Sequence, residues 1–141
     1  MSADSRPAFA LSNPPGLYDP SSNGYSHVAA VAPGARLLFI AGQGGEDVDG
    51  RLPAEFAAQA RQALANLDTA LRSRGASLQQ VFKLTLLIVD HDEHRLREWV
   101  SEANRVWESG HPVCTLIPVP RLALDGMLVE IDAVAACCEA V

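Results

Sequence analysis

The sequence predicts a single α+β domain in which two helices pack on one face of a β-sheet. Its periodic segments follow the order strand, strand, helix, strand, helix, strand, strand, and both helical segments carry one apolar stripe. No internal repeat or linker divides the chain. The 141 residues are enough for one domain that buries about two-thirds of the surface of its unfolded chain.

The N-terminal segment, residues 1–24, is expected to be an irregular arm, because it is rich in Pro, Ser, Asn and Asp, which favour turns. Residues 25–141 form the predicted domain. Its first two strands are expected at residues 27–31 and 37–41, on either side of a Pro-Gly turn. The glycine-rich loop that follows lacks the spacing of a phosphate-binding loop, so we expect a tight turn there, approached by a ligand or a neighbouring backbone.

Two helices are predicted, at residues 53–74 and 92–109. The first opens on a proline, and Gly75 suits the residue just past its end. Asp92 is expected to cap the second helix, which ends at Gly110. The apolar residues at three- and four-residue spacing are Phe56, Ala60, Ala63, Leu64, Leu67 and Leu71 in the first helix, and Leu96, Trp99, Val100, Ala103, Val106 and Trp107 in the second.

Three more strands are predicted, at residues 81–89, 113–119 and 128–136. In the first of them, Phe82, Leu84, Leu86 and Ile88 form a wholly apolar side. The final strand alternates between two sets, which are Val129, Ile131, Ala133 and Ala135 on one side and Leu128, Glu130, Asp132 and Val134 on the other. The first set can lie under the helices. The second is too apolar for bulk water and too charged for a dry core, so we expect another subunit to cover it.

The charge balance and the cysteines limit the partners and the compartment. The 11 basic and 17 acidic residues give a net charge of −6, and no basic run could neutralise several phosphates, so nucleic acid is not expected as a partner. The three cysteines form no disulfide framework, which suits a reducing cytoplasm. No secretory signal or membrane-spanning run is visible, so we expect a cytoplasmic protein with no membrane partner.

The apolar final strand contains a carboxylate, Glu130. Its presence there calls for a structural or functional explanation, because desolvating a charge is costly. The pieces that accompany it are Tyr25-Ser26-His27, Phe39-Ile40-Ala41-Gly42-Gln43, Gln59 with Asn66-Leu67, Gly75-Ala76-Ser77-Leu78 with Val81 and Lys83, Pro112, Arg121-Leu122, and Glu130-Ile131-Asp132-Ala133-Val134-Ala135. In this order and spacing they resemble the Rid (YjgF-type) family, small proteins best known as enamine/imine deaminases. The resemblance implies a chorismate-mutase-like fold with one mixed β-sheet, and a homotrimer with three equivalent clefts between subunits. It implies no metal or organic cofactor.

Three positions of the implied substrate-binding cleft depart from the family pattern. In the deaminating members an arginine two residues after the matching proline binds the substrate carboxylate, and here Cys114 takes its place. A thiol offers nothing like the charged, bidentate fork of a guanidinium. Ala41 replaces a serine often found beside the cleft glycine, and Val100 falls near a cleft asparagine. The arginine with which the deaminating members bind the carboxylate of a 2-imino acid is therefore missing.

Tyr25, Gly42 and Glu130 match the cleft, and two roles are open for Glu130. It could hold and polarise a water for attack on a C=N carbon, or it could pair with a group of a neighbouring subunit. Cys114 also has two interpretations, a reactive thiol or a small packing residue. The segment His91-Asp92-Glu93-His94 looks like a metal-ligand cluster, but an acidic helix start explains it equally and no metal is expected.

Two functions from different classes follow from these residues. The first is a hydrolase, deaminase-like, that acts on a small imine, enamine or related C=N compound in clefts between subunits, with Glu130 as the catalytic residue. The second is a non-catalytic protein that binds a small molecule or a partner on the same trimeric scaffold. A ribonuclease is less favoured, because the acidic balance and the lack of a basic groove oppose RNA binding. The sequence leaves the substrate open.

Overall fold

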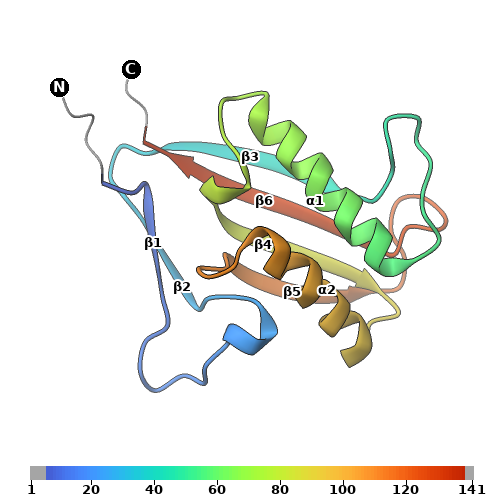
Figure 1. The fold of residues 1–141 in the computed structure, drawn as a ribbon, viewed down its shortest axis with the longest axis horizontal. Helices are drawn as coiled ribbons and strands as arrows, with labels where there is room; N and C mark the ends of the chain where they lie inside the picture. Colours follow the sequence, from blue (N-terminus) through green and yellow to red (C-terminus); the bar gives the residue numbers. More distant parts are fainter. Residues whose placement is uncertain (1–5, 139–141) are drawn as a thin grey trace.

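Four strands form the central sheet in the order β3-β6-β4-β5 (Figure 1). The computed structural model describes residues 6–138. The strands are β3 (Arg36–Gln43), β4 (Val81–Val89), β5 (Val113–Val119) and β6 (Val129–Cys137). Strand β6 pairs antiparallel with both β3 and β4, whereas β4 and β5 run parallel, so the sheet is mixed. A parallel pair needs a crossover, and the second helix supplies it.

Two helices, α1 (Phe56–Arg72) and α2 (Glu93–Val106), lie on the same face of this sheet (Figure 1). Helix α2 begins as predicted, because the Asp92 side chain accepts a hydrogen bond of 2.8 Å from the backbone N–H of Arg95. Helix α1 starts a few residues later than its opening proline suggested. Beyond its end, Gly75 has a φ of +77°, the left-handed conformation that glycine adopts without strain. The α+β prediction is therefore confirmed.

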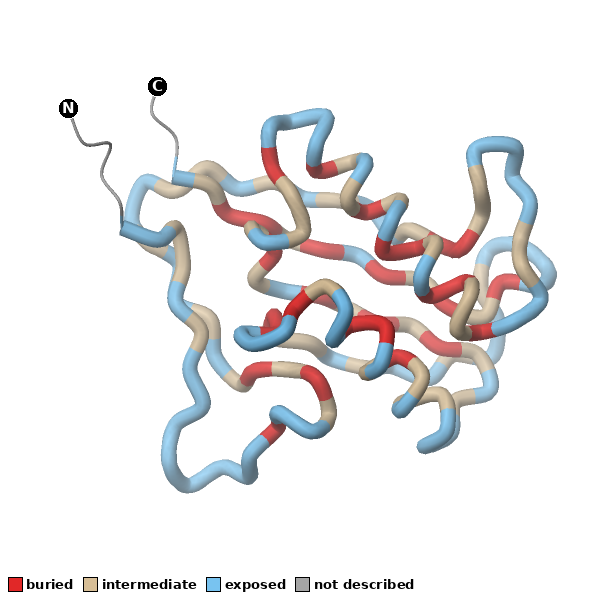
Figure 2. Tube along the Cα trace, in the orientation of Figure 1, coloured by how far each residue is buried: buried red, intermediate tan, exposed pale blue. Residues whose placement is uncertain are grey.

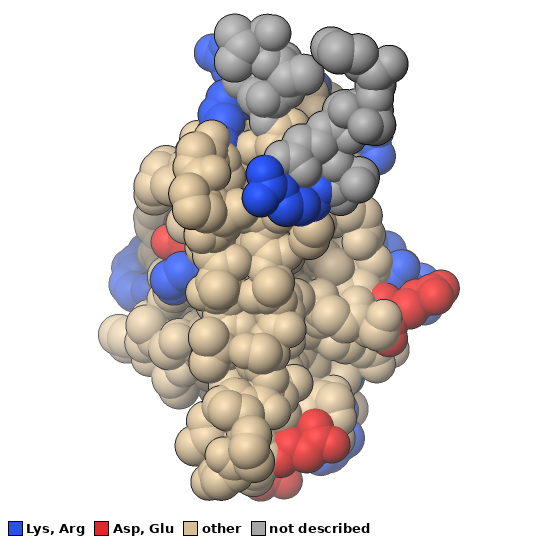
Figure 3. All heavy atoms as spheres, turned by 90° about the vertical axis from the view of Figure 1, so that its left-hand side faces the viewer, with Lys and Arg blue, Asp and Glu red and all other residues tan. Residues whose placement is uncertain are grey.

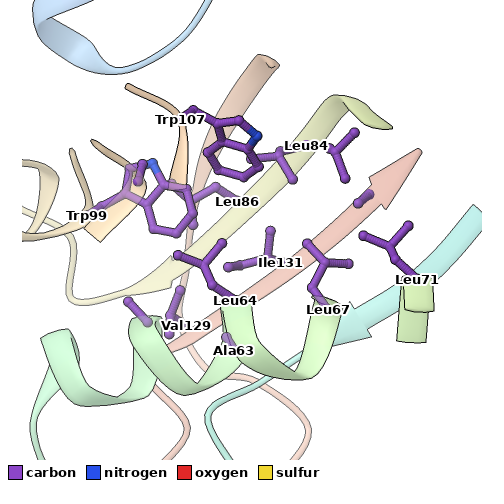
Figure 4. Packing of buried hydrophobic residues seen from close by; sticks show 14 of the residues in the cluster. Ala63, Leu64, Leu67, Leu71, Leu84, Leu86, Trp99, Trp107, Val129 and Ile131 are labelled. Carbon is purple, nitrogen blue, oxygen red and sulfur yellow. The ribbon is translucent and has the colours of Figure 1, made fainter. Parts of the chain in front are cut away.

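The core lies between the helices and the sheet. Buried residues follow β4, β6 and the inner sides of both helices (Figure 2), and the two tryptophans pack against the leucines of α1 and β4 (Figure 4). On β6 the buried set is the one that the alternation predicted, which is Val129, Ile131, Ala133 and Ala135. No helix of residues 6–138 lies on the opposite face of the sheet (Figure 1). We call it the open face, and we call the covered one the helix face.

The sequence predicts one sheet, whereas the strands of the structure form two sheets. Strand β1 (Phe9–Ser12) pairs antiparallel with β2 (Val28–Val31) in a separate two-stranded ribbon. The segment predicted to be an irregular arm therefore contains a strand, followed by a short 3-10 turn at Ser21–Asn23. Four residues are too few to show a strand pattern, and their partner lies far along the chain. In addition, the ring of Phe9 packs on Phe82 at 5.8 Å.

That contact explains a second difference, in the face pattern of β4. The sequence placed Phe82 on the apolar side with Leu84, but the buried residue is Val81 instead. The pairing of β4 with β6 shifts between Val81 and Lys83, so the alternation slips by one residue at the start of the strand. Phe82 turns toward the ribbon, while Leu84 and the residues after it keep the predicted sides.

Candidate functional site: two half-sites on opposite faces of the sheet

Glu130 extends from the middle of β6 onto the open face. Its neighbours Val129 and Ile131 are buried on the helix face, and successive side chains of a strand point to opposite sides. The Glu130 carboxylate lies directly over Gly42 of β3, where a β-carbon would overlap it. An irregularity in the β3–β6 pairing between Ile40 and Gln43 brings Gly42 to this place. Glycine leaves the space that the end of this flexible side chain occupies.

Two amide side chains of α1, the buried Gln59 and the half-buried Asn66, fix the loops on both sides of this contact. The Gln59 side chain donates to the carbonyl oxygen of Gly126 at 2.9 Å and accepts from the backbone N–H of Leu128 at 2.9 Å. Asn66 donates to the carbonyl oxygens of Gly44 and Glu46, at 3.0 and 2.8 Å. These bonds tie the chain just after β3 and just before β6 to one helix. Helix α1 thereby holds both strands in the register that sets Glu130 over Gly42.

The surroundings of Glu130 on the open face are mostly apolar and exposed. Phe39 has 74% of its surface exposed, and Leu37 and Ile117 each have 43%. Ala41 is exposed on the same strand as Phe39. Among residues 6–138, no group donates a hydrogen bond to the Glu130 carboxylate. A charged group and large apolar side chains thus share a surface that has no partner among the described residues.

Cys114 lies on the helix face, at the border of a pocket of about 400 Å³. It pairs across the sheet with Leu84, which is buried in the core, so the two side chains share a face. The pocket opens between α2, the edge strand β5 and the segment around Tyr25. Its lining residues are Asn23, Tyr25, Leu86, His91, Leu96, Trp99, Cys114, Thr115 and Leu116. Tyr25 and Cys114, two of the predicted substrate-binding residues, are therefore brought together here.

The Cys114 thiol is held in its neutral form. Burial raises the pKa of Cys114 to about 12, and this outweighs the opposing effect of the positive charge on Lys83. At neutral pH the fraction of thiolate is therefore negligible. The structure favours a small packing residue at this position over a reactive nucleophile.

Tyr25 is held at the pocket by its neighbours. Its hydroxyl shares a hydrogen bond with that of Tyr18, which, together with burial, raises the pKa of Tyr25 to about 12. Both rings meet His27 edge to face, at 5.4 and 5.5 Å between ring centroids. The next residue, Ser26, donates from its side chain to the carbonyl oxygen of His111 at 2.6 Å, just before β5. The N-terminal segment is thereby fixed to the rim of the pocket.

Val100, the fourth predicted substrate-binding position, does not line this pocket. It lies on α2 beside Gly24, where a β-carbon would be 3.3 Å from one of its methyl groups. Leu96 and Trp99 of the same helix do line the pocket. Val100 instead lines a neighbouring hollow, which it shares with Leu96, Asn23 and Arg97.

The predicted residues form two half-sites that a single chain does not join. Glu130 pairs with Leu87 on β4, whereas Cys114 pairs with Leu84. These two β4 positions are three residues apart, so their side chains point to opposite faces. Glu130, Gly42 and Ala41 thus belong to the open face, and Tyr25 and Cys114 belong to the helix face. A site that uses both halves requires a second copy of the chain.

No ligand role is predicted from the sequence for several residues that line the pocket, above all Trp99 and His91. Trp99 was expected to be a core residue, and it is also one. His91 was considered only as half of a metal-binding pair with His94. In the structure His91 lines the pocket, whereas the His94 ring lies 3.3 Å from the Glu98 carboxylate. Within residues 6–138, no group of three or more metal-ligating side chains is gathered, and no helix is long and apolar enough to cross a membrane.

Comparison with known proteins places the chain among relatives of the same fold. The family model described as Endoribonuclease L-PSP matches residues 18–137. YyfB from Yersinia pestis, a Rid-family protein of unknown function, is 32% identical, with a TM-score of 0.86 over 92% of this chain and 99% of its own.

A Mycobacterium tuberculosis member of the YjgF/YER057c/UK114 family is 29% identical, with a TM-score of 0.62 over 92% of this chain and 99% of its own. TdcF from E. coli, solved with bound serine, is 26% identical, with a TM-score of 0.65 over 77% of this chain and 85% of its own. No curated protein matches the sequence. The Rid neighbours have the chorismate-mutase-like α+β fold that the resemblance implied. The chain therefore belongs to the Rid (YjgF-type) family.

Proposed function

We propose that the protein hydrolyses a small imine, enamine or related C=N compound in clefts between the subunits of a homotrimer, in the cytoplasm. The observation that carries this proposal is the Glu130 carboxylate, which lies over Gly42 on the open face with no hydrogen-bond donor among residues 6–138. A second copy that covered this carboxylate among apolar groups would have to pair it or use it, so its place on the open face favours a role in chemistry or assembly.

Glu130 has the right chemistry for adding water to a C=N bond. The water oxygen forms a bond to the carbon and the π electrons move to the nitrogen. Glu130 accepts the proton that the water loses and passes it to the nitrogen, which gives the tetrahedral carbinolamine. Glu130 then takes the hydroxyl proton of the carbinolamine and gives it to the same nitrogen, so that the C–N bond breaks, ammonia or an amine leaves, and the C=O bond forms. The step needs no redox partner, and we assign it no cofactor.

The assembly of the site follows from the two half-sites. A second copy that covers the exposed Phe39, Leu37 and Ile117 would remove apolar surface from water, which favours association. The same contact would allow the pocket of one copy to face Glu130 of another. The family resemblance supplies the trimer and its three clefts. The structure of TdcF with bound serine shows that one relative takes up a small molecule.

The substrate should differ from the 2-imino acids of the deaminating relatives. Cys114 stands where their arginine binds a carboxylate, and it is a neutral thiol. The described residues that line the pocket include no lysine or arginine that could bind a carboxylate in its place. A substrate without a carboxylate, or with one that is held elsewhere, fits this chain better.

Two other functions remain candidates. A non-catalytic small-molecule-binding protein would use the same pocket without Glu130. A ribonuclease, which the family model's description suggests, is less supported because the net charge is −6 and the ribbon side of the molecule carries only scattered charges (Figure 3).

Glu130→Gln tests the catalytic role. The amide has nearly the same shape but cannot accept a proton, so we expect the rate on a panel of oxidase-generated imines to fall by roughly a hundred- to ten-thousandfold, with the trimer intact. Asp132→Asn is the control, since Asp132 lies on the same strand and face and is exposed. Turnover, melting temperature and mass are measured side by side. Unchanged turnover with a lower melting temperature would remove Glu130 from catalysis and favour the binding function.

A further inference from the structure

The helix-face pocket is apolar where a ligand would be most deeply buried. Its walls are Leu86, Leu96, Trp99 and Leu116, and two of them, Leu86 and Trp99, belong to the hydrophobic core (Figure 4). No lysine or arginine is among its lining residues. A volume of about 400 Å³ is enough for a small molecule with one ring or a branched chain.

One polar atom in this pocket has no partner. The Nδ1 atom of His91 is buried and makes no hydrogen bond with residues 6–138. Buried polar atoms are nearly always paired, and this nitrogen is closed off from solvent, so the ring has to turn to offer it to a ligand in the pocket. The carboxylate of the neighbouring Asp92 makes no hydrogen bond to this nitrogen either; it accepts from the backbone N–H of Arg95.

The backbone sets His91 in this position. Strand β4 ends at Val89, and Asp90 then has a φ of +51°, in the left-handed region that non-glycine residues seldom adopt. The turn at Asp90 directs the chain from β4 to the cap of α2, with His91 between them. The other polar groups at the pocket are neutral: Asn23, Thr115, and the hydroxyl of Tyr25, which is already bonded to Tyr18.

We propose that this pocket selects neutral compounds that have an aromatic or branched apolar end, and that His91 is the specificity-determining residue that hydrogen-bonds their polar group. This inference rests on the proposed function in one respect: it assumes that the side chain of the substrate lies in this pocket. The apolar end would lie against Trp99 and Leu96. A carboxylate would lose its hydration there and find no lysine or arginine, which strongly disfavours it.

The test compares two probes of the same shape, phenylacetamide and phenylacetate, at about pH 8. Binding is followed by NMR through the indole N–H signals of the only two tryptophans. Trp99 lines the pocket and should shift, whereas Trp107 donates to the carbonyl oxygen of Leu78 in the core and is the internal reference. We expect the amide to bind roughly tenfold or more tightly than the acid.

Two variants examine His91. His91→Leu removes the hydrogen bond and should weaken phenylacetamide binding roughly tenfold, while His91→Asn keeps a polar group near Nδ1 and should retain most of it. Leu96→Trp fills the pocket and should abolish binding. Tighter binding of phenylacetate, a shift of neither tryptophan, or full affinity in His91→Leu would each overturn the inference.

The failure of this inference can be distinguished from failure of the proposed function. If phenylacetamide binds as expected but no C=N compound is hydrolysed, the pocket is correct and the catalytic proposal fails. If hydrolysis depends on Glu130 but occurs only with carboxylate-bearing imines, the catalytic proposal stands and the inference about His91 fails.

Discussion

The two faces of the central sheet hold opposite halves of a possible active site. On the open face, the Glu130 carboxylate lies over Gly42 among exposed apolar side chains. On the helix face, Tyr25 and Cys114 border an apolar pocket, and the pKa of each is raised to about 12. Among the described residues, the open face has a carboxylate but no pocket around it. The helix face has a pocket but no charged group of the predicted site. Chemistry that needs both therefore depends on how two copies meet.

The largest effect should come from separating the copies. Phe39→Glu puts a charge on the most exposed aromatic side chain of the open face, and burying that charge against a second copy is costly. We expect a monomer at micromolar concentration and no detectable turnover, whereas the parent should have the mass of a trimer in light scattering. Val48→Glu is the control, because Val48 is fully exposed in a loop outside the sheet. A trimeric Phe39→Glu variant would exclude the open face from assembly.

Gly42→Ala changes the open face without adding a charge. The new β-carbon overlaps the Glu130 carboxylate, so this side chain must move. We expect a loss of rate approaching that of Glu130→Gln, roughly a hundredfold, because a general base works only within hydrogen-bond reach of its proton. When both changes are combined, the losses should not add, since the second one acts on a base that is already disabled. Additive losses would indicate a separate role for Gly42.

Cys114→Arg is intended to give the helix face the charge that it lacks. A guanidinium at this position could bind a carboxylate with two hydrogen bonds, so affinity for phenylacetate should rise roughly tenfold or more. Cys114→Ser, which adds no charge, is the control and should leave the preference for the amide unchanged. Calorimetry measures both variants. No gain for the acid in a folded Cys114→Arg protein would show that position 114 does not face the ligand.

The sequence predicted most of the fold because its signals are local. The stripe of α1, the Asp92 cap and the alternation of β6 each depend on neighbouring residues, and the structure has them all. Strand β1 and the slip at Phe82 were not predictable in this way. Both depend on a contact between Phe9 and Phe82, which are far apart in the chain.

The candidate site was predictable only as a set of residues. The resemblance named Glu130, Gly42, Tyr25 and Cys114, but it gave no sign that they lie on two faces, which follows from the pairing register of β4. It also missed the position of His91 at the pocket. That position comes from the turn at Asp90 after the end of β4, which is not visible in a residue string.

The smallest expected effect concerns stability in alkaline solution and tests whether the helix face is kept neutral. Burial raises the pKa of Cys114 from an ordinary value of 9.0 to about 12. Between these values the unfolded chain has lost a proton that the folded chain keeps, so the stability from this group is complete below pH 9.0 and is lost as the pH rises toward about 12. Cys114→Ala removes this loss, so its melting temperature should fall less than the parent's from about pH 8 to about pH 10. Cys138→Ala, at an exposed cysteine, should follow the parent. Equal slopes in all three proteins would mean that Cys114 ionises as readily in the folded state as in the unfolded state, and the neutral character assigned to the pocket would then be wrong.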